Sequence, residues 1–349
     1  MFQKKNELAW NVLKKDGPMG VVNLGIRFIE GKTHPENVNF FLTSAQVELT
    51  TACNLRCTMC EQSHLTQNPI SMKFTEFKKF LDNAPYIELI NFTGIGEILL
   101  NPDWFKILEY SKQKGLYVWF NDNFTLMNKE NSQKIIDLEI DALAVSFDGA
   151  TKQIYEKIRR GANFEKVTAN IKQFTGLKKA LGKKKPEFFM VFVAMKENIH
   201  EMEPLIELAK NLGVNKVLFV GVITFEGTED KSLNNLKKEE MEKIFEKTKA
   251  KAEELGITIM GLPSISRTEQ EECDYPWVSA YITSSGEVLP CCFVKQRDKS
   301  EVSSSSMGNI KENSFKEIWK GKKYAVLRKK LKEKNYPSFC DGCYKLKKN

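Results

Sequence analysis

The stretch that decides the fold is VELTTACNLRCTMC, which spans residues 47–60 and carries Cys53, Cys57 and Cys60. The cysteines have C-x3-C-x2-C spacing, and residues 45–50 before them alternate apolar and polar side chains as a β-strand does. Three thiolates on one tight loop can hold three irons of a 4Fe–4S cube and leave the fourth iron open to a ligand. Half of a zinc site is the alternative, but such sites usually pair two C-x2-C knuckles or add histidines. The sequence therefore predicts a cluster loop at the carboxyl end of a strand, where α/β barrels place their chemistry.

The composition indicates a chain with a sizeable core and a mild basic excess. Of its 349 residues 42% are hydrophobic, and 53 Lys and Arg against 45 Asp and Glu give a net charge of +8. The lysines are scattered among glutamates, as on solvated helix faces, so a nucleic acid or an anionic membrane surface is allowed but not demanded. No apolar run approaches the ~18 residues of a membrane span, and no signal-peptide core follows the first residues. We therefore expect a cytoplasmic protein whose cysteines serve metal rather than disulfides.

Strand-like and helix-like segments alternate from residue 45 onward. The predicted strands are residues 45–50, 87–93, 116–120, 142–147, 188–194 and 214–220. The predicted helices are residues 73–82, 103–114, 129–138, 152–159, 165–181, 200–212 and 237–255. Apolar strands that alternate with amphipathic helices are typical of parallel βαβ units. The pattern predicts an α/β fold, a partial (β/α)6 TIM-like barrel over residues 45–262, after an N-terminal extension over residues 1–44.

The cysteine loop closely resembles that of the radical S-adenosylmethionine (radical SAM) family. In that family SAM chelates the open iron, and one electron splits SAM into methionine and a 5′-deoxyadenosyl radical that abstracts hydrogen from substrate. The resemblance implies SAM, a SAM-binding 4Fe–4S cluster on Cys53, Cys57 and Cys60, and flavodoxin or ferredoxin as electron donor. Met59, between the last two cysteines, matches the apolar residue that packs on adenine in the family.

Further resemblances concern the ends of the next strands. The TGIGE segment resembles the G-G-E segment of the family, which implies that Gly94, Gly96 and Glu97 bind SAM. A glycine lets the backbone approach a ligand closely, and a glutamate can accept a hydrogen bond from the SAM ammonium. Asn123 and Ser146 take the places of SAM contacts after the third and fourth strands.

Arg159 begins a segment that resembles the R-x-G of the family. An arginine there could pair bidentately with the SAM carboxylate, and a solvent-exposed pair is the alternative. Asp148, just after the fourth strand, is either part of this SAM site or a helix N-cap. Residues 20–29, in the N-terminal extension, are apolar and form either a substrate or membrane-surface element or a cap on the barrel.

The remaining five cysteines form a second group in the last part of the chain, residues 263–349. A glycine turn between residues 281–283 and 287–289 predicts a β-hairpin, and a helix is expected over residues 314–331. This pattern resembles the SPASM/twitch extension of radical SAM enzymes, a small α+β domain, and implies a second, auxiliary 4Fe–4S cluster. Its implied ligands are Cys273, Cys291, Cys340 and Cys343. A structural zinc ribbon would use the same four thiolates.

Cys292 is left over from this ligand set. It is a candidate catalytic hydrogen-atom donor to a substrate radical, a substitute ligand for Cys291, or a small buried apolar residue.

The whole pattern predicts a radical SAM oxidoreductase that abstracts hydrogen from an unactivated C–H bond. The auxiliary cluster would accept an electron, giving dehydrogenation or crosslinking of a sugar or aminocyclitol, a peptide or a lipid. The alternatives are an iron–sulfur or zinc scaffold that binds a partner, and a radical SAM enzyme that modifies RNA. Nucleic acid is the least favoured substrate because the sequence shows no basic stripe interleaved with aromatic residues.

Overall fold

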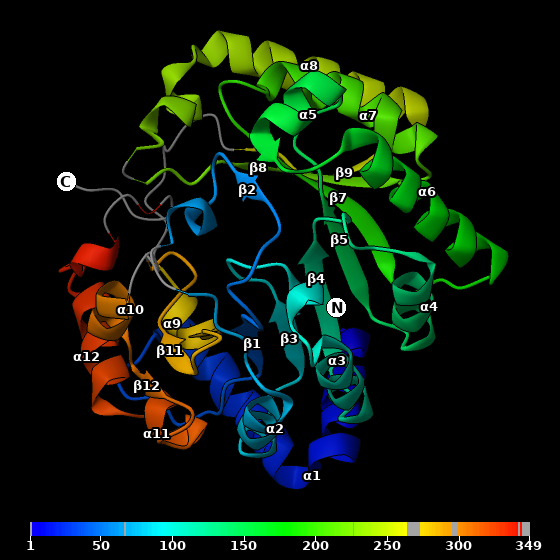
Figure 1. Cartoon of the computed structure of the whole chain (residues 1–349). Helices are drawn as coiled ribbons and strands as arrows, with labels where there is room; N and C mark the ends of the chain where they lie inside the picture. The colour runs from blue at the N-terminus through cyan, green and yellow to red at the C-terminus, as the bar shows by residue number, and fades with distance from the viewer. Residues whose placement is uncertain are drawn as a thin grey trace.

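The structure is a computed structural model that describes residues 2–65, 68–225, 227–263, 273–294, 299–340 and 343. Its centre is one curved sheet in the order β12-β11-β10-β1-β3-β4-β5-β7-β8-β9. Six of these strands are parallel neighbours and form the predicted partial barrel (Figure 1). They are β1 (Ser44–Val47), β3 (Leu89–Phe92), β4 (Tyr117–Asp122), β5 (Ala142–Ser146), β7 (Glu187–Ala194) and β8 (Lys216–Gly221). The (β/α)6 prediction is therefore confirmed.

Seven helices follow these strands and cover the outer face of the sheet (Figure 1). They are α2 (Phe74–Asp82), α3 (Trp104–Gln113), α4 (Lys129–Asp137), α5 (Lys152–Ile158), α6 (Phe164–Ala180), α7 (Met202–Asn211) and α8 (Lys238–Leu255). Each buries an apolar stripe, as Phe77, Phe80 and Leu81 do in α2. The predicted helices agree with the observed ones to within two residues at each end.

An additional strand, β9 (Thr258–Gly261), pairs in parallel with β8 and was not predicted. It has four residues at the edge of the sheet, and two of them are exposed. Such a short, half-exposed segment gives little periodic signal, and the strand forms because β8 offers a free edge.

The N-terminal extension is mostly one bent helix, α1 (Phe2–Thr33), whose bend lies at Gly17. Gly17 has a φ of 67°, which interrupts the helix and turns the chain, and a second helical segment follows. Asn23 in that second segment exchanges hydrogen bonds with the backbone of Phe41, and the Glu30 carboxylate accepts one from the Asn39 N–H at 2.8 Å. One face of residues 20–29 therefore caps the barrel.

Several large apolar side chains of the same helix are exposed. They are Met19, Val22, Phe28 and Ile29. No helix in the described part of the chain is long and apolar enough to cross a membrane.

The predicted hairpin in the last part of the chain is confirmed as β10 (Tyr281–Ile282) and β11 (Glu287–Leu289), which pair antiparallel. β10 also pairs in parallel with β1, so the hairpin extends the barrel sheet across its first strand (Figure 1). A short strand, β12 (Gly308–Asn309), pairs with β11 and ends the sheet.

The single helix expected over residues 314–331 is wrong, because two helices occupy this segment. α11 (Phe315–Trp319) and α12 (Lys322–Lys332) are separated at Gly321. A Cβ at Gly321 would lie 2.7 Å from the carbonyl oxygen of Glu317, so only glycine fits this tight break. Arg328 of α12 is buried and stacks on Trp319, which fixes the two helices against each other.

Candidate active site

A pocket opens at the carboxyl ends of β1, β3, β4 and β5 and is lined by the loops that follow these strands. All ten residues expected to hold the first cluster and SAM line it. They are Cys53, Cys57, Met59, Cys60, Gly94, Gly96, Glu97, Asn123, Ser146 and Arg159. These residues come from positions 53 to 159 and from five separate segments, so only the fold brings them together.

The cluster loop is held by a small second sheet. β2 (Arg56–Cys57) pairs antiparallel with β6 (Arg159–Arg160), and the Thr58 N–H donates to the Ile158 carbonyl at 2.9 Å. The middle cysteine therefore lies directly opposite Arg159 in this ladder.

A side-chain network holds the same loop from the β4 side. The Asn123 amide nitrogen donates to Asn54 Oδ1 at 3.0 Å, and Asn54 in turn donates to Thr125 Oγ1 at 2.7 Å. The Asn123 amide oxygen accepts from the N–H and the hydroxyl of Thr125. The Asn123 side chain thus positions the cluster loop, a role that the sequence did not suggest.

The two glycines after β3 have different neighbours. A Cβ at Gly96 would lie 2.6 Å from the Ala52 carbonyl oxygen and closer still to that of Thr50. A Cβ at Gly94 would instead meet the side chain of Glu48. Both glycines let the loop after β3 pack directly on β1 and on the start of the cluster loop, where the Glu97 N–H donates to the Ala52 carbonyl at 2.7 Å.

Two buried carboxyl groups, those of Glu97 and Asp122, lie side by side in the pocket wall. Burial, and then the negative charge of Asp122, raise the pKa of Glu97 well above its ordinary value, and burial raises the pKa of Asp122 to about 6. Close carboxylates resist ionising together, so the pair favours holding one proton between its two groups. Asp122 was not among the predicted site residues, although its place at the end of β4, beside Asn123, was a usable signal.

Arg159 and Asp148 form a buried ion pair, with Nη2 and Oδ2 2.6 Å apart. Arg159 is only 6% exposed, so the alternative of a solvent-exposed pair is wrong. Asp148 accepts from the Val193 N–H at 2.7 Å, and the N-cap of α5 is Thr151, so the N-cap interpretation of Asp148 is also wrong. The Nε–H of Arg159 has no hydrogen-bond partner among the described residues. The guanidinium therefore keeps a free donor at the pocket.

The three thiols of the loop are suited to a metal group. Burial raises the pKa of Cys53 to about 11 and that of Cys60 to about 12, and it also raises that of Cys57. The positive charge of the Arg159 guanidinium lowers the pKa of all three thiols, against the effect of burial. Since the thiolate is the form that binds metal, protons must leave as iron enters. Three sulfurs beside one buried cation fit an anionic iron–sulfur group.

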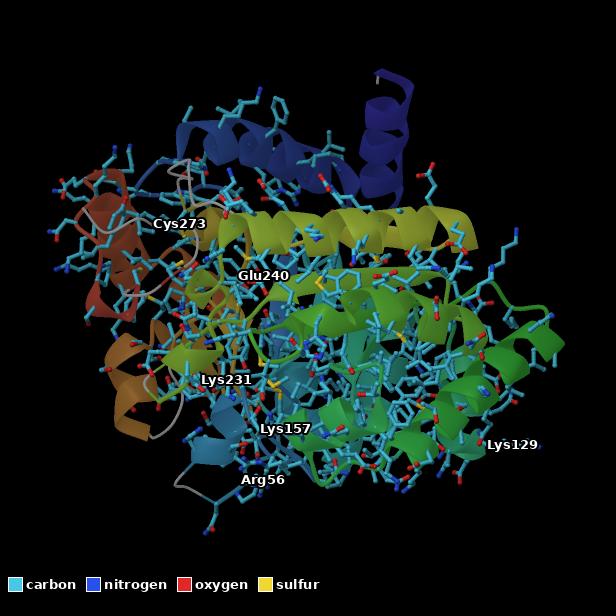
Figure 2. The ribbon with its side chains drawn as sticks, turned by 90° about the horizontal axis from the view of Figure 1, so that it is seen from above. Arg56, Lys129, Lys157, Lys231, Glu240 and Cys273 are labelled. Carbon is cyan, nitrogen blue, oxygen red and sulfur yellow. The ribbon has the colours of Figure 1, made fainter. Side chains whose placement is uncertain are left out.

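An ion-pair group joins the loop after β7 to α5 and to the loop after β8. Lys231, in the loop after β8, and Lys157 of α5 both contact the Glu197 carboxylate, at 3.0 and 3.2 Å. Figure 2 shows Lys231 and Lys157 in the same part of the molecule. Burial raises the pKa of Glu197, but the two lysines lower it more, so that it lies below its ordinary value. The loop after β8 is thereby tied to α5 and to the loop after β7.

The second group of cysteines lies around the C-terminal hairpin. Cys291 follows β11 and interacts electrostatically with Cys340 and Cys273, and burial raises its pKa. The Cys343 N–H donates to the Cys340 carbonyl at 3.1 Å, which holds these two cysteines close together. The structure thus gathers the expected sulfurs from three separate segments.

Cys292 has a different environment from the other cysteines. Its side chain is exposed, which contradicts the interpretation as a small buried apolar residue. It contacts the hydroxyl of Tyr275, and it is not among the residues that line the pocket.

Within the described residues, no three His, Cys, Asp or Glu side chains lie close enough together to hold a single metal ion. The sulfur ligands of one zinc ion lie about 3.8 Å apart, whereas a cubane spreads its thiolates around a larger core.

Comparison with known proteins gives two family matches. The model of the radical SAM superfamily matches residues 47–209, and the model of the SPASM iron–sulfur cluster-binding domain matches residues 273–344. The two matches fall on the two cysteine groups. They imply a SAM-binding 4Fe–4S cluster, SAM and auxiliary iron–sulfur binding.

Individual relatives agree with this assignment. The chain is 28% identical over 322 residues to the tungsten-containing aldehyde ferredoxin oxidoreductase cofactor-modifying protein of Pyrococcus furiosus, covering 85% of this chain and 86% of that one. It is 25% identical over 325 residues to the subtilosin biosynthesis protein AlbA of Bacillus subtilis, covering 86% of this chain and 66% of that one. SAM-bound SuiB of Streptococcus suis has the same fold, with a TM-score of 0.70 at 14% identity over 94% of this chain and 78% of that one. The chain therefore belongs to the radical SAM superfamily and carries a C-terminal SPASM iron–sulfur cluster-binding domain.

Proposed function

We propose that this radical SAM enzyme is an oxidoreductase that removes hydrogen from an unactivated C–H bond of an organic substrate. The observation that carries the proposal is the single pocket in which three cysteines, two glycines, a buried carboxyl pair and a buried arginine meet. When bound there, the cluster supplies the electron that cleaves SAM to methionine and the 5′-deoxyadenosyl radical.

The pocket residues have distinct proposed roles. Cys53, Cys57 and Cys60 would hold the cluster, and the unpartnered Nε–H of Arg159 would be a donor available to this anionic group. The carboxyl pair of Glu97 and Asp122 gives up its shared proton when the SAM ammonium arrives, which keeps the charge of the wall balanced.

The remaining walls give SAM its place. Gly94 and Gly96 bring the backbone of their loop close to the ligand, and Met59 offers an apolar surface to adenine. Ser146, at the end of β5, also lines the pocket.

The second part of the proposal concerns the C-terminal cysteines. Cys273, Cys291, Cys340 and Cys343 are the proposed ligands of an auxiliary 4Fe–4S cluster. With four thiolates it has no open iron, so it would accept an electron from the substrate radical rather than bind substrate. In this two-electron oxidation the substrate would lose a hydrogen atom to the 5′-deoxyadenosyl radical, an electron to the auxiliary cluster and a proton to a base. A flavodoxin or ferredoxin is the proposed electron donor.

The substrate class follows from the relatives only in outline. One relative is named for modifying a cofactor and another for the biosynthesis of the bacteriocin subtilosin. A peptide or a cofactor-sized molecule is therefore the proposed substrate, and the open side of a six-stranded barrel leaves room for either.

The test is an anaerobic reconstitution followed by SAM and dithionite. We expect 5′-deoxyadenosine above the level of a Cys57→Ala variant, and about eight irons per chain for two clusters. Equal 5′-deoxyadenosine in both proteins would contradict the proposed reaction. About four irons with one zinc would contradict the auxiliary cluster alone.

A further inference from the structure

Glu48 is a buried carboxylate for which neither the sequence nor the reaction gives a role. It follows β1 directly and is 1% exposed. Its carboxylate accepts four hydrogen bonds: from the Ile95 N–H at 3.0 Å, the Tyr281 hydroxyl at 2.9 Å, and the Ser284 N–H and hydroxyl at 3.1 and 2.8 Å. Among the described residues no lysine or arginine forms an ion pair with it.

Four donors occupy the lone-pair sites that a carboxylate offers. A buried charge without a cation is tolerated only when such donors replace its water. Because each site is already used, Glu48 has no acceptor left for a further ligand. Its role is therefore to hold other groups in place.

The donors come from two regions that are far apart in the sequence. Ile95 lies between Gly94 and Gly96, in the loop that faces SAM. Tyr281 and Ser284 belong to β10 and its turn, in the hairpin that leads to Cys291. One side chain thus joins the SAM-facing loop to the hairpin of the auxiliary site.

The contact is also close on the barrel side. A Cβ at Gly94 would lie 2.6 Å from Cβ of Glu48, so this loop rests on the Glu48 side chain with no space between them. On the hairpin side, the Glu48 N–H donates to the Ile282 carbonyl at 2.8 Å, in addition to the bonds that its carboxylate accepts. A displacement of either partner therefore moves the donors of the other.

We propose that Glu48 is a positioning residue that couples SAM binding in the barrel to the order of the C-terminal hairpin. SAM against residues 94–97 fixes the Ile95 N–H, Glu48 keeps its orientation, and the donors of Tyr281 and Ser284 are held with it. The hairpin then keeps Cys291 in a fixed relation to the first cluster. The proposal rests on the proposed function, because SAM is the ligand that starts the coupling.

The test is hydrogen–deuterium exchange of the anaerobic two-cluster holoenzyme, oxidised and without reductant, so that SAM binds but is not cleaved. In the wild type we expect SAM to slow exchange in residues 94–99 and, by about fivefold or more, in residues 281–289, as for an ordinary coupling between two sites. In Glu48→Gln an amide N–H2 faces two of the former donors. We therefore expect SAM no longer to slow exchange in residues 281–289 (the hairpin response), while it still slows exchange in residues 94–99 (the loop response).

Two milder variants cover a failure of Glu48→Gln to fold. Tyr281→Phe and Ser284→Ala each remove one of the four donors, and we expect each to reduce the hairpin response by a part. Iron content equal to that of the wild type shows that both clusters are present in the variants compared.

Glu201→Gln is the matched control. Glu201 is also buried and accepts from the Ala150 N–H, the Thr151 N–H and the Thr151 hydroxyl, but it contacts no part of the hairpin among these bonds. This variant is expected to keep the full hairpin response to SAM.

The outcomes separate the two proposals. A wild type that responds in residues 94–99 but not in the hairpin, or a Glu48→Gln variant that keeps the hairpin response, overturns the coupling alone. A wild type with no response to SAM in residues 94–99 overturns the proposed function, and the coupling with it.

Discussion

The two cysteine groups of this molecule are built in opposite ways. The first lies within eight residues, and its loop is fixed by the β2–β6 ladder, by Asn54 and Asn123, and by the bond from Glu97 to Ala52. The second is drawn from residues 273 to 343, and the strands around it are only two or three residues long. We therefore expect the fold to preform the first site, whereas the second should rely more on its metal to hold its separate segments together.

Removing one cysteine from each group should give the largest difference. Cys57→Ala is expected to lower the rate of 5′-deoxyadenosine formation at least ~1,000-fold, because the cluster that donates an electron to SAM is lost. The melting temperature should change little. Cys340→Ala is expected to keep SAM cleavage and to lose about four irons. It should also speed up hydrogen exchange in the C-terminal hairpin, because the hairpin loses its metal crosslink.

Iron content, product assay and exchange on the same preparations check this prediction. If Cys57→Ala loosens its own loop as much as Cys340→Ala loosens the hairpin, the first site is not preformed and the comparison fails.

Each region also contains a buried arginine, and only one of them has a carboxylate partner. Arg159→Met leaves the Asp148 carboxylate buried without its cation, so we expect a loss of about 3–5 kcal/mol in the free energy of unfolding. Among the described residues, Arg328 donates to the carbonyls of Pro276 and Trp319, and Arg328→Met should cost about 1–3 kcal/mol, the penalty for carbonyls without donors.

Denaturant unfolding of both variants, followed by circular dichroism, measures the difference. The double variant Asp148→Asn/Arg159→Met should recover part of the loss, since it leaves no buried charge. Equal losses for Arg159→Met and Arg328→Met would show that the ion pair adds nothing to the rigidity of the first site.

The same contrast explains what could be predicted from the sequence. The cluster loop, the six barrel strands and the GxGE segment are local patterns, and local patterns carry the βαβ signal. The pairing of β10 with β1 joins residues 46 and 281, and no local pattern records such a contact. The roles of Glu48, Asp122 and Asn123 likewise depend on partners that only the fold brings near, so residue type and spacing could not reveal them.

The two glycines after β3 test how tightly the preformed site is packed. Gly96→Ala places a methyl against backbone carbonyls of Thr50 and Ala52, which cannot move without shifting the cluster loop, so SAM affinity should fall about 100-fold or more. Gly94→Ala places it against the Glu48 side chain, which can shift in part, so a smaller loss of about tenfold is expected.

Equilibrium binding of SAM to the reconstituted, oxidised protein measures both affinities. Gly115→Ala is an informative control, because that glycine has a φ of 73° but no atom within 4 Å of the added methyl. It should affect stability and leave SAM affinity unchanged. A larger loss for Gly94→Ala than for Gly96→Ala would contradict the packing described for this loop.

The smallest effect concerns the end of the barrel away from both metal sites. Asp141 lies between Lys112 and Lys185, with Nζ–O distances of 2.5 Å to each. Burial raises the pKa of Asp141, but the two lysines lower it more, so that it lies below its ordinary value of 3.8. Because the folded-state pKa is below the unfolded one, this stabilisation is fully present above about pH 4 and is lost as the pH falls through the folded pKa. We expect Asp141→Asn to lower the free energy of unfolding by about 1–2 kcal/mol at pH 7, and by progressively less below pH 4.

Urea unfolding of the metal-free protein at pH 7 and near pH 3 measures the two differences. If the barrel is preformed without metal, the pH-dependent difference persists in this metal-free protein. A metal-free barrel that shows no cooperative unfolding would mean that the first site, like the second, needs its metal to form.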